Sequence, residues 1–128
     1  MISFLGLWHL RRRVFDRLTG DETVFDGTAE VTRTAFEERC TVYHSHGTFD
    51  ANRTYILHPA GGGVQVRFPD DRAFVGIDER ARQHVRHLCG NDLYRGRFLF
   101  GDGEWREAWT VRGPRKDYIS LTRYRRAG

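Results

Sequence analysis

The sequence predicts an all-β protein: an antiparallel up-and-down β-barrel of eight or nine strands with little helix. Along most of the chain apolar residues alternate with polar ones, as expected for strands with one buried face. Turn-forming residues recur at short intervals, and Gly101-Asp-Gly103 is the clearest hairpin signal. Only residues 78–84 have helical character, enough for one turn of helix or a loop capped by Asp78.

The length of 128 residues predicts a single domain spanning residues 1–128. A chain of about this length can bury roughly two-thirds of its unfolded surface, so it needs no disulfide or structural metal to fold. Cys40 and Cys89 lack the spacing of a redox or metal motif, and we expect two reduced, partly buried thiols. The sequence shows neither a signal peptide nor a membrane span, which predicts a cytoplasmic protein.

The expected strands follow from the alternation and from the turns between them. In the first strand Trp8, Leu10 and Arg12 share the better core face, with one charge among apolar neighbours. In the third, Glu38, His44 and other alternate residues share one side. The expected strands cover residues 4–14, 24–32, 35–48, 53–58, 64–68, 73–77, 85–100, 104–112 and 116–125.

A barrel of about eight strands has an interior that side chains fill or that holds one small ligand. Polar residues fall on the inferred inward faces among aromatic neighbours, and a buried Arg needs an acidic partner or an anionic ligand. The sequence therefore predicts a lumen that binds a small, partly apolar and possibly anionic molecule. The alternative is an internal Arg12–Glu107 ion pair with tyrosine hydroxyls completing it. The candidate ligand-binding residues are Arg12, His44, Tyr94, Glu107 and Tyr118.

The histidines offer a second hypothesis, a metal, haem or enzymatic site. His44 and His46 are two apart on an expected strand and would point the same way. His87, Cys89 or His58 could add a third ligand, and imidazole with thiolate suits zinc or copper. His87 and Cys89 also share a face, as a thiolate–imidazolium pair would require. No full ligand spacing and no enzyme motif is present, so we expect no cofactor and regard an enzyme as the less favoured class.

Charge offers a third hypothesis, an interaction module. The net charge is +4, and Lys116 is the only lysine among the 21 basic residues. Arg-rich outer faces could bind an acidic partner, and a homodimer is possible. The basic residues are interleaved with acidic ones, which makes nucleic acid an unlikely partner.

Three segments together resemble known proteins. Gly6-Leu-Trp8 resembles the start of lipocalins and other calycins. Residues 87–98 and 109–118, followed by Tyr124-Arg125, resemble a family of small uncharacterised bacterial proteins with a calycin-like (lipocalin-like) barrel. The resemblance extends from Phe4 to Arg126 and implies a closed antiparallel barrel but no activity.

In calycins a basic residue of the last strand packs over the tryptophan of the first, so the resemblance implies that Arg123 or Arg125 covers Trp8. The chain departs from the family at His44-Ser-His46, where Arg and Glu are expected. A metal role for these histidines is therefore not implied by the family.

Overall fold

A computed structural model describes residues 4–127, which form ten antiparallel strands in one sheet. Residues 4–127 contain no α-helix, and thus none long and apolar enough to cross a membrane. The strands are β1 (Gly6–Asp16), β2 (Glu22–Val31), β3 (Ala35–His44), β4 (Gly47–Ala60), β5 (Gly63–Arg67), β6 (Ala73–Ile77), β7 (Arg82–Cys89), β8 (Asp92–Gly101), β9 (Glu104–Gly113) and β10 (Lys116–Arg126).

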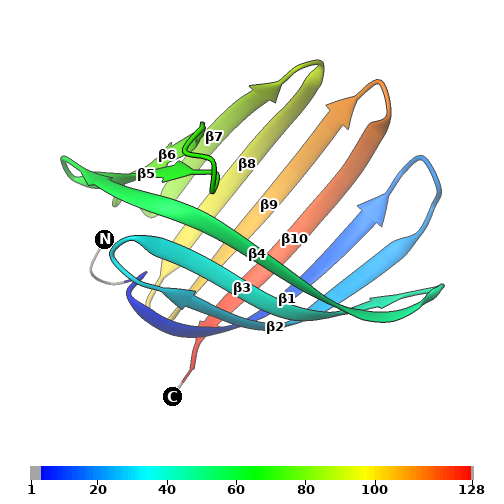
Figure 1. Cartoon of the computed structure of the whole chain (residues 1–128), viewed down its shortest axis with the longest axis horizontal. Coiled ribbons are helices and arrows are strands. Elements are labelled where there is room, and N and C mark those ends of the chain that lie inside the picture. Colours follow the sequence, from blue (N-terminus) through cyan, green and yellow to red (C-terminus); the bar gives the residue numbers. More distant parts are fainter. Residues whose placement is uncertain (1–3, 128) are drawn as a thin grey trace.

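The sheet curls into a nearly closed up-and-down barrel (Figure 1). Its strand order is β6-β5-β4-β3-β2-β1-β10-β9-β8-β7, so all hydrogen-bonded neighbours are consecutive in sequence except β1 and β10. The two end strands, β6 and β7, approach each other without a backbone ladder between them. We call this junction the seam. The expected all-β up-and-down barrel is confirmed.

Alternation along the strands explains which face lines the interior. Trp8, Leu10 and Arg12 of β1 are all buried, whereas Leu7, directly before Trp8, is half exposed. A side-chain period of two places one face of each strand inside the barrel. The core face predicted for the first strand is therefore confirmed.

Two expected strands run past a turn, and the one over residues 85–100 is in fact a hairpin, so the structure has ten strands where eight or nine were expected. Residues 85–100 turn back at Gly90, whose positive φ of 60° suits glycine, and β7 then pairs with β8 from Cys89↔Asp92. Residues 35–48 turn back after His44, and β3 pairs with β4 from His44↔Gly47. Sequence alternation continues across such short turns, so it does not reveal them.

The segment 78–84 contains no helical turn: residues 78–81 form a loop, and residues 82–84 begin β7. Asp78 accepts a hydrogen bond from the backbone N–H of Arg80 at 2.9 Å. The buried Gln83 side chain bonds Asp78 and Arg80 backbone groups through three hydrogen bonds. The side-chain hydrogen bonds of Gln83 thus hold the loop that joins β6 to β7.

The Trp8 end of the barrel, where β1 begins and β10 ends, is packed with aromatic rings. Trp8 and Trp105 meet edge to face at 4.4 Å between centroids, and Trp105 stacks on Tyr124 at 4.1 Å. The guanidinium of Arg126 lies 4.2 Å from the Trp8 ring. The expectation of Arg123 or Arg125 at this place was wrong, because the β1–β10 register puts Arg126 opposite Trp8.

The opposite end, which we call the Tyr118 end, carries the turns that join β1 to β2, β3 to β4, β5 to β6, β7 to β8 and β9 to β10. Both cysteines are free: Cys40 is buried on β3, but Cys89 lies exposed where β7 ends. The expectation of a partly buried Cys89 was wrong, because the residue ends its strand at a turn.

Candidate functional site

The barrel encloses a cavity of about 510 Å³ between the Trp8 end and the Tyr118 end. Pockets for small molecules are usually about 300–1,000 Å³ and mainly apolar. The aromatic residues that line this cavity are Phe4, Phe25, Phe36, Tyr55, Phe74, Tyr94, Phe98, Phe100, Trp105, Trp109 and Tyr118. Its charged lining residues are Arg12, Glu38, Arg53 and Glu107.

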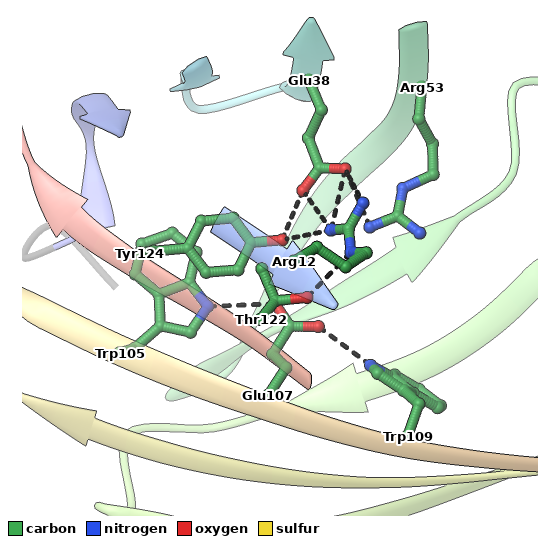
Figure 2. Close-up of polar contacts among 8 residues, drawn as sticks. All are labelled: Arg12, Glu38, Arg53, Trp105, Glu107, Trp109, Thr122 and Tyr124. Atoms are coloured by element: carbon green, nitrogen blue, oxygen red, sulfur yellow. Dashed lines mark hydrogen bonds and ion pairs between the residues drawn. The ribbon is translucent and has the colours of Figure 1, made fainter. Parts of the chain in front are cut away.

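A charged cluster built from β1, β3 and β4 forms one part of the wall (Figure 2). Arg12 makes a bidentate ion pair with Glu38, with Nη2 at 3.0 Å from Oε2 and 3.1 Å from Oε1. Its Nε donates to Thr122 at 2.8 Å, and its Nη2 donates to the Tyr124 hydroxyl at 3.0 Å. Tyr124 in turn donates a hydrogen bond to Glu38. Arg12 is therefore held on several sides by protein groups.

Arg53 is the second guanidinium on the same carboxylate. Its Nη2 lies 2.9 Å from Glu38 Oε1, and its side chain remains 43% exposed. The guanidinium also lies 5.1 Å from the centroid of the Tyr55 ring. Two arginines thus share one buried glutamate, and Glu107 is the second carboxylate among the charged residues of the cavity wall.

The environment shifts the titration of the cluster. Burial acts to raise the pKa of Glu38, but the nearby guanidinium groups of Arg53 and Arg12 outweigh it and hold that pKa below its ordinary value. Burial, with the carboxylates of Glu107 and Glu38, raises the pKa of Tyr124 well above its ordinary value. Glu38 is therefore ionised and Tyr124 protonated near neutral pH, which matches the direction of their hydrogen bond.

Glu107 faces the cavity from β9 and binds two indole rings. Its Oε2 accepts from Trp105 Nε1 at 3.0 Å, and its Oε1 accepts from Trp109 Nε1 at 2.9 Å (Figure 2). The alternative of an Arg12–Glu107 ion pair was wrong, because Arg12 pairs with Glu38. Both tryptophans lie two residues from Glu107, so the strand places all three side chains on the same face.

Three nearly parallel rings cross the cavity wall at the seam. Phe74 of β6 stacks on Tyr55 of β4 at 5.5 Å and 9°, and on Trp109 of β9 at 5.4 Å and 17°. Trp109 lies against Gly96 of β8, where an added Cβ would come within 2.8 Å of the ring. Glycine at this position is what allows the indole to lie so close to the sheet.

Four of the five candidate ligand-binding residues, Arg12, Tyr94, Glu107 and Tyr118, line the cavity. The Tyr94 hydroxyl accepts a hydrogen bond from Lys116 Nζ at 3.1 Å. Burial, followed by the neighbouring Tyr94, raises the pKa of Tyr118. The fifth candidate, His44, does not line the cavity but a separate hollow at the Tyr118 end, beside Asp21.

The candidate metal ligands are spread over several places. The His44 and His46 rings stack at 5.1 Å, and His44 Nδ1 accepts the backbone N–H of His46 at 3.2 Å. His87 packs against Phe74 at the seam. His58 lies 3.3 Å from Asp71. Among residues 4–127, no three His, Cys, Asp or Glu side chains are grouped so that they could hold a metal ion.

Two aspartates near the turns of the Tyr118 end take part in ion pairs. The Asp92 carboxylate lies 3.3 Å from Lys116 Nζ. The Asp117 carboxylate lies 3.8 Å from Arg112 Nε. Hydrogen bonds to Tyr94 and Asp92 raise the pKa of Lys116, which is therefore cationic near neutral pH.

The sequence-based set of candidate residues missed Glu38 and Arg53. Glu38 was placed on the inward face, and a buried acidic residue among apolar neighbours was the available signal. Arg53 lies directly opposite Glu38 in the β3–β4 ladder. That pairing depends on the turn after His44, which the expected strand 35–48 omitted.

These features define a nearly closed antiparallel β-barrel with an aromatic cavity and internal charges. The model of the Family of unknown function (DUF6314) matches residues 4–126, and the chain therefore belongs to this family. A search of curated protein sequences found no significant match.

Proposed function

We propose that the barrel binds a small, partly apolar molecule in its lumen. The observation that carries this proposal is the cavity of about 510 Å³ lined largely by aromatic rings. A cavity of this kind gains from burying apolar ligand surface, while a few polar groups set the ligand's orientation. The up-and-down strand order around an interior space is also the basis on which we propose a calycin-like relationship.

We propose further that an anionic group of the ligand lies at Arg53. Arg12 is engaged by Glu38, Thr122 and Tyr124, whereas Arg53 contacts Glu38 through Nη2 and is half exposed. A guanidinium presents several N–H donors in a fixed fork that suits carboxylates.

The first test uses the neutral fluorophore N-phenyl-1-naphthylamine, whose emission rises in apolar surroundings. Ser120 is buried and lines the cavity, while its neighbour Leu121 is 44% exposed. Ser120→Phe should fill part of the lumen and weaken binding by about tenfold, which corresponds to ~1.4 kcal/mol. The matched variant Leu121→Phe should bind as the unmodified protein does. Absent binding, or an equal effect of both variants, would refute a lumen site.

The second test addresses charge. The sulfonate 1-anilinonaphthalene-8-sulfonate resembles the neutral fluorophore in size and ring content, and it should bind more tightly. Arg53→Gln should remove this preference without weakening the neutral fluorophore. Arg39 is exposed on β3, so Arg39→Gln provides the control for loss of one positive charge. If Arg39→Gln and Arg53→Gln have the same effect, the preference arises from overall charge and not from Arg53.

A further inference from the structure

The rings of Tyr55, Phe74 and Trp109 stack on one another in a geometry that a bound aromatic ring could also take up. The outer rings lie nearly parallel to the central one, within 9° and 17°, at centroid distances of 5.5 and 5.4 Å. Aromatic rings attract one another in such offset stacks at about 4.5–7 Å between centroids. All three rings line the cavity, so the slot between Tyr55 and Trp109 opens onto the lumen.

The outer rings of this slot are firmly placed. Tyr55 is on β4, which is hydrogen-bonded to β3 and β5, and Trp109 is on β9, between β8 and β10. Trp109 is further held by its hydrogen bond to Glu107 and by its contact with Gly96. The spacing of the outer rings is therefore set by the sheet itself.

The central ring lies on a less firmly held strand, although it also contacts the rings of Phe68 and His87 at 4.9 and 5.2 Å between centroids. Phe74 belongs to β6, a strand of five residues at the end of the sheet that pairs only with β5. The β5–β6 register shifts between Val66 and Arg67. Arg67 pairs with Ala73, the residue directly before Phe74. Because no backbone ladder closes the seam, Phe74 can rotate outward there without breaking a β6–β7 ladder.

From these observations we propose that the ligand carries a planar aromatic ring, which inserts between Tyr55 and Trp109 in place of Phe74. This inference rests on the proposed function, because the ring reaches the slot from the lumen. Phe74 itself stacks on both outer rings and so covers part of the surface that the inserted ring would cover. The Arg53 guanidinium lies 5.1 Å from the Tyr55 ring centroid and would favour ligands whose acidic group reaches it from the slot.

The test compares naphthalene-2-carboxylate, which is planar, with its saturated decahydro analogue, which has the same charge and a similar shape. Isothermal titration calorimetry should give about tenfold tighter binding of the planar acid, since only that acid can stack on both outer rings. Phe74→Leu and Phe74→Ala should tighten binding of the planar acid several-fold, because no ring needs to be displaced. Leucine keeps most of the apolar volume and guards against loss of the fold.

The control variant is Phe100→Ala, which also removes a ring from the cavity lining but lies outside the slot. It should not tighten binding of the planar acid. Equal affinity for the two acids, or weaker binding by both Phe74 variants, would overturn the ring-insertion proposal. If only N-phenyl-1-naphthylamine binds, the lumen site stands and the ring-insertion proposal falls. If none of the probes binds, both proposals fall.

Discussion

Arg12 and Glu38 form a bidentate ion pair inside the barrel, and both side chains are at least 92% buried, with exposed fractions of 8% and 1%. Arg12 is on β1 and Glu38 on β3, so the pair spans β2 between them. Desolvating two charges is costly, and such a pair is poor evidence for a gain in stability. Together with the half-exposed Arg53, the pair instead places a fixed cationic group at the cavity wall.

Removing one partner of this pair should be far more harmful than removing both. Glu38→Gln leaves Arg12 charged and buried, and we expect a loss of about 3–5 kcal/mol in the free energy of unfolding. The double variant Arg12→Met/Glu38→Leu should recover much of that loss. Urea denaturation measures both values.

The control for this prediction is the exposed pair Arg13–Glu22, joined at 2.8 Å. Arg13→Met should change the free energy of unfolding by no more than about 1 kcal/mol. If Glu38→Gln has an equally small effect, the buried pair does not have the role we assign to it.

Acid should destabilise the barrel partly through Glu38. Its pKa is lowered in the folded state, so its contribution is present above the ordinary glutamate pKa of about 4.3 and is lost as the pH falls through the folded value. The free energy of unfolding should therefore decline more steeply below about pH 4.3 in the unmodified protein than in Arg12→Met/Glu38→Leu.

Asp70, Asp78 and Glu104 also have lowered pKa values, owing to hydrogen bonds from neighbouring Arg residues. They are present in both proteins, so the difference between the two pH profiles isolates the cluster around Glu38. Identical profiles would show that this carboxylate does not contribute to the pH dependence.

Gly96→Ala should disturb the ring that lies on it. The new methyl group would come within 2.8 Å of the Trp109 indole, and overpacking of this kind usually costs about 1–3 kcal/mol. We expect a lower free energy of unfolding and an altered near-ultraviolet circular dichroism signal. Gly62→Ala is the control, because nothing lies within 4 Å of a Cβ at that position. Equal effects of the two substitutions would contradict the close contact between Gly96 and Trp109.

The two cysteines should react with a thiol reagent at very different rates. Cys89 is exposed, whereas burial, followed by the charge of Glu38, raises the pKa of the buried Cys40 thiol. The reactive thiolate is therefore scarcer at Cys40 near neutral pH. Ellman's reagent should modify one thiol rapidly and the other slowly, and Cys89→Ser should abolish the fast phase alone.

Cys40 also lines the cavity, so a lumen ligand should slow its modification further and leave Cys89 unaffected. Naphthalene-2-carboxylate serves as the probe. Equal protection of both thiols would indicate binding outside the lumen.

Much of the fold could be predicted from the period-two pattern, because the side chains of each barrel strand alternate between the interior and the outer face. Trp8, Leu10 and Arg12 were correctly placed on one buried face. The tight turns after His44 and Cys89 were missed as hairpins. At such turns the alternation continues unbroken while the chain reverses, so hydrophobicity alone does not locate the reversal.

The site was less predictable, since partners depend on the registers of several strands at once. Arg12 has an inward carboxylate on either side: Glu38 across β2 and Glu107 across β10. The sequence does not say toward which one the side chain leans. By contrast, the spacing Trp105-x-Glu107-x-Trp109 was a usable signal, because one strand face brings the carboxylate and both indoles together.

The pairing of β1 with β10 places the beginning of β1 beside the end of β10 (Figure 1). The backbone N–H of Ala127 donates to the carbonyl of Leu7 at 2.9 Å. The order of the strands in the sheet differs from their order in the sequence because β10 pairs with β1. The strands β6 and β7, which are consecutive in the sequence, lie at opposite ends of the sheet and meet only at the seam. A circular permutant with the ends joined and the chain opened within residues 78–81 would contain the strands in their spatial order. Pairings such as Arg12 with Thr122, now 110 residues apart, would become local. Folding rates rise as contact order falls, so the native connectivity carries a kinetic penalty concentrated in this one long-range closure.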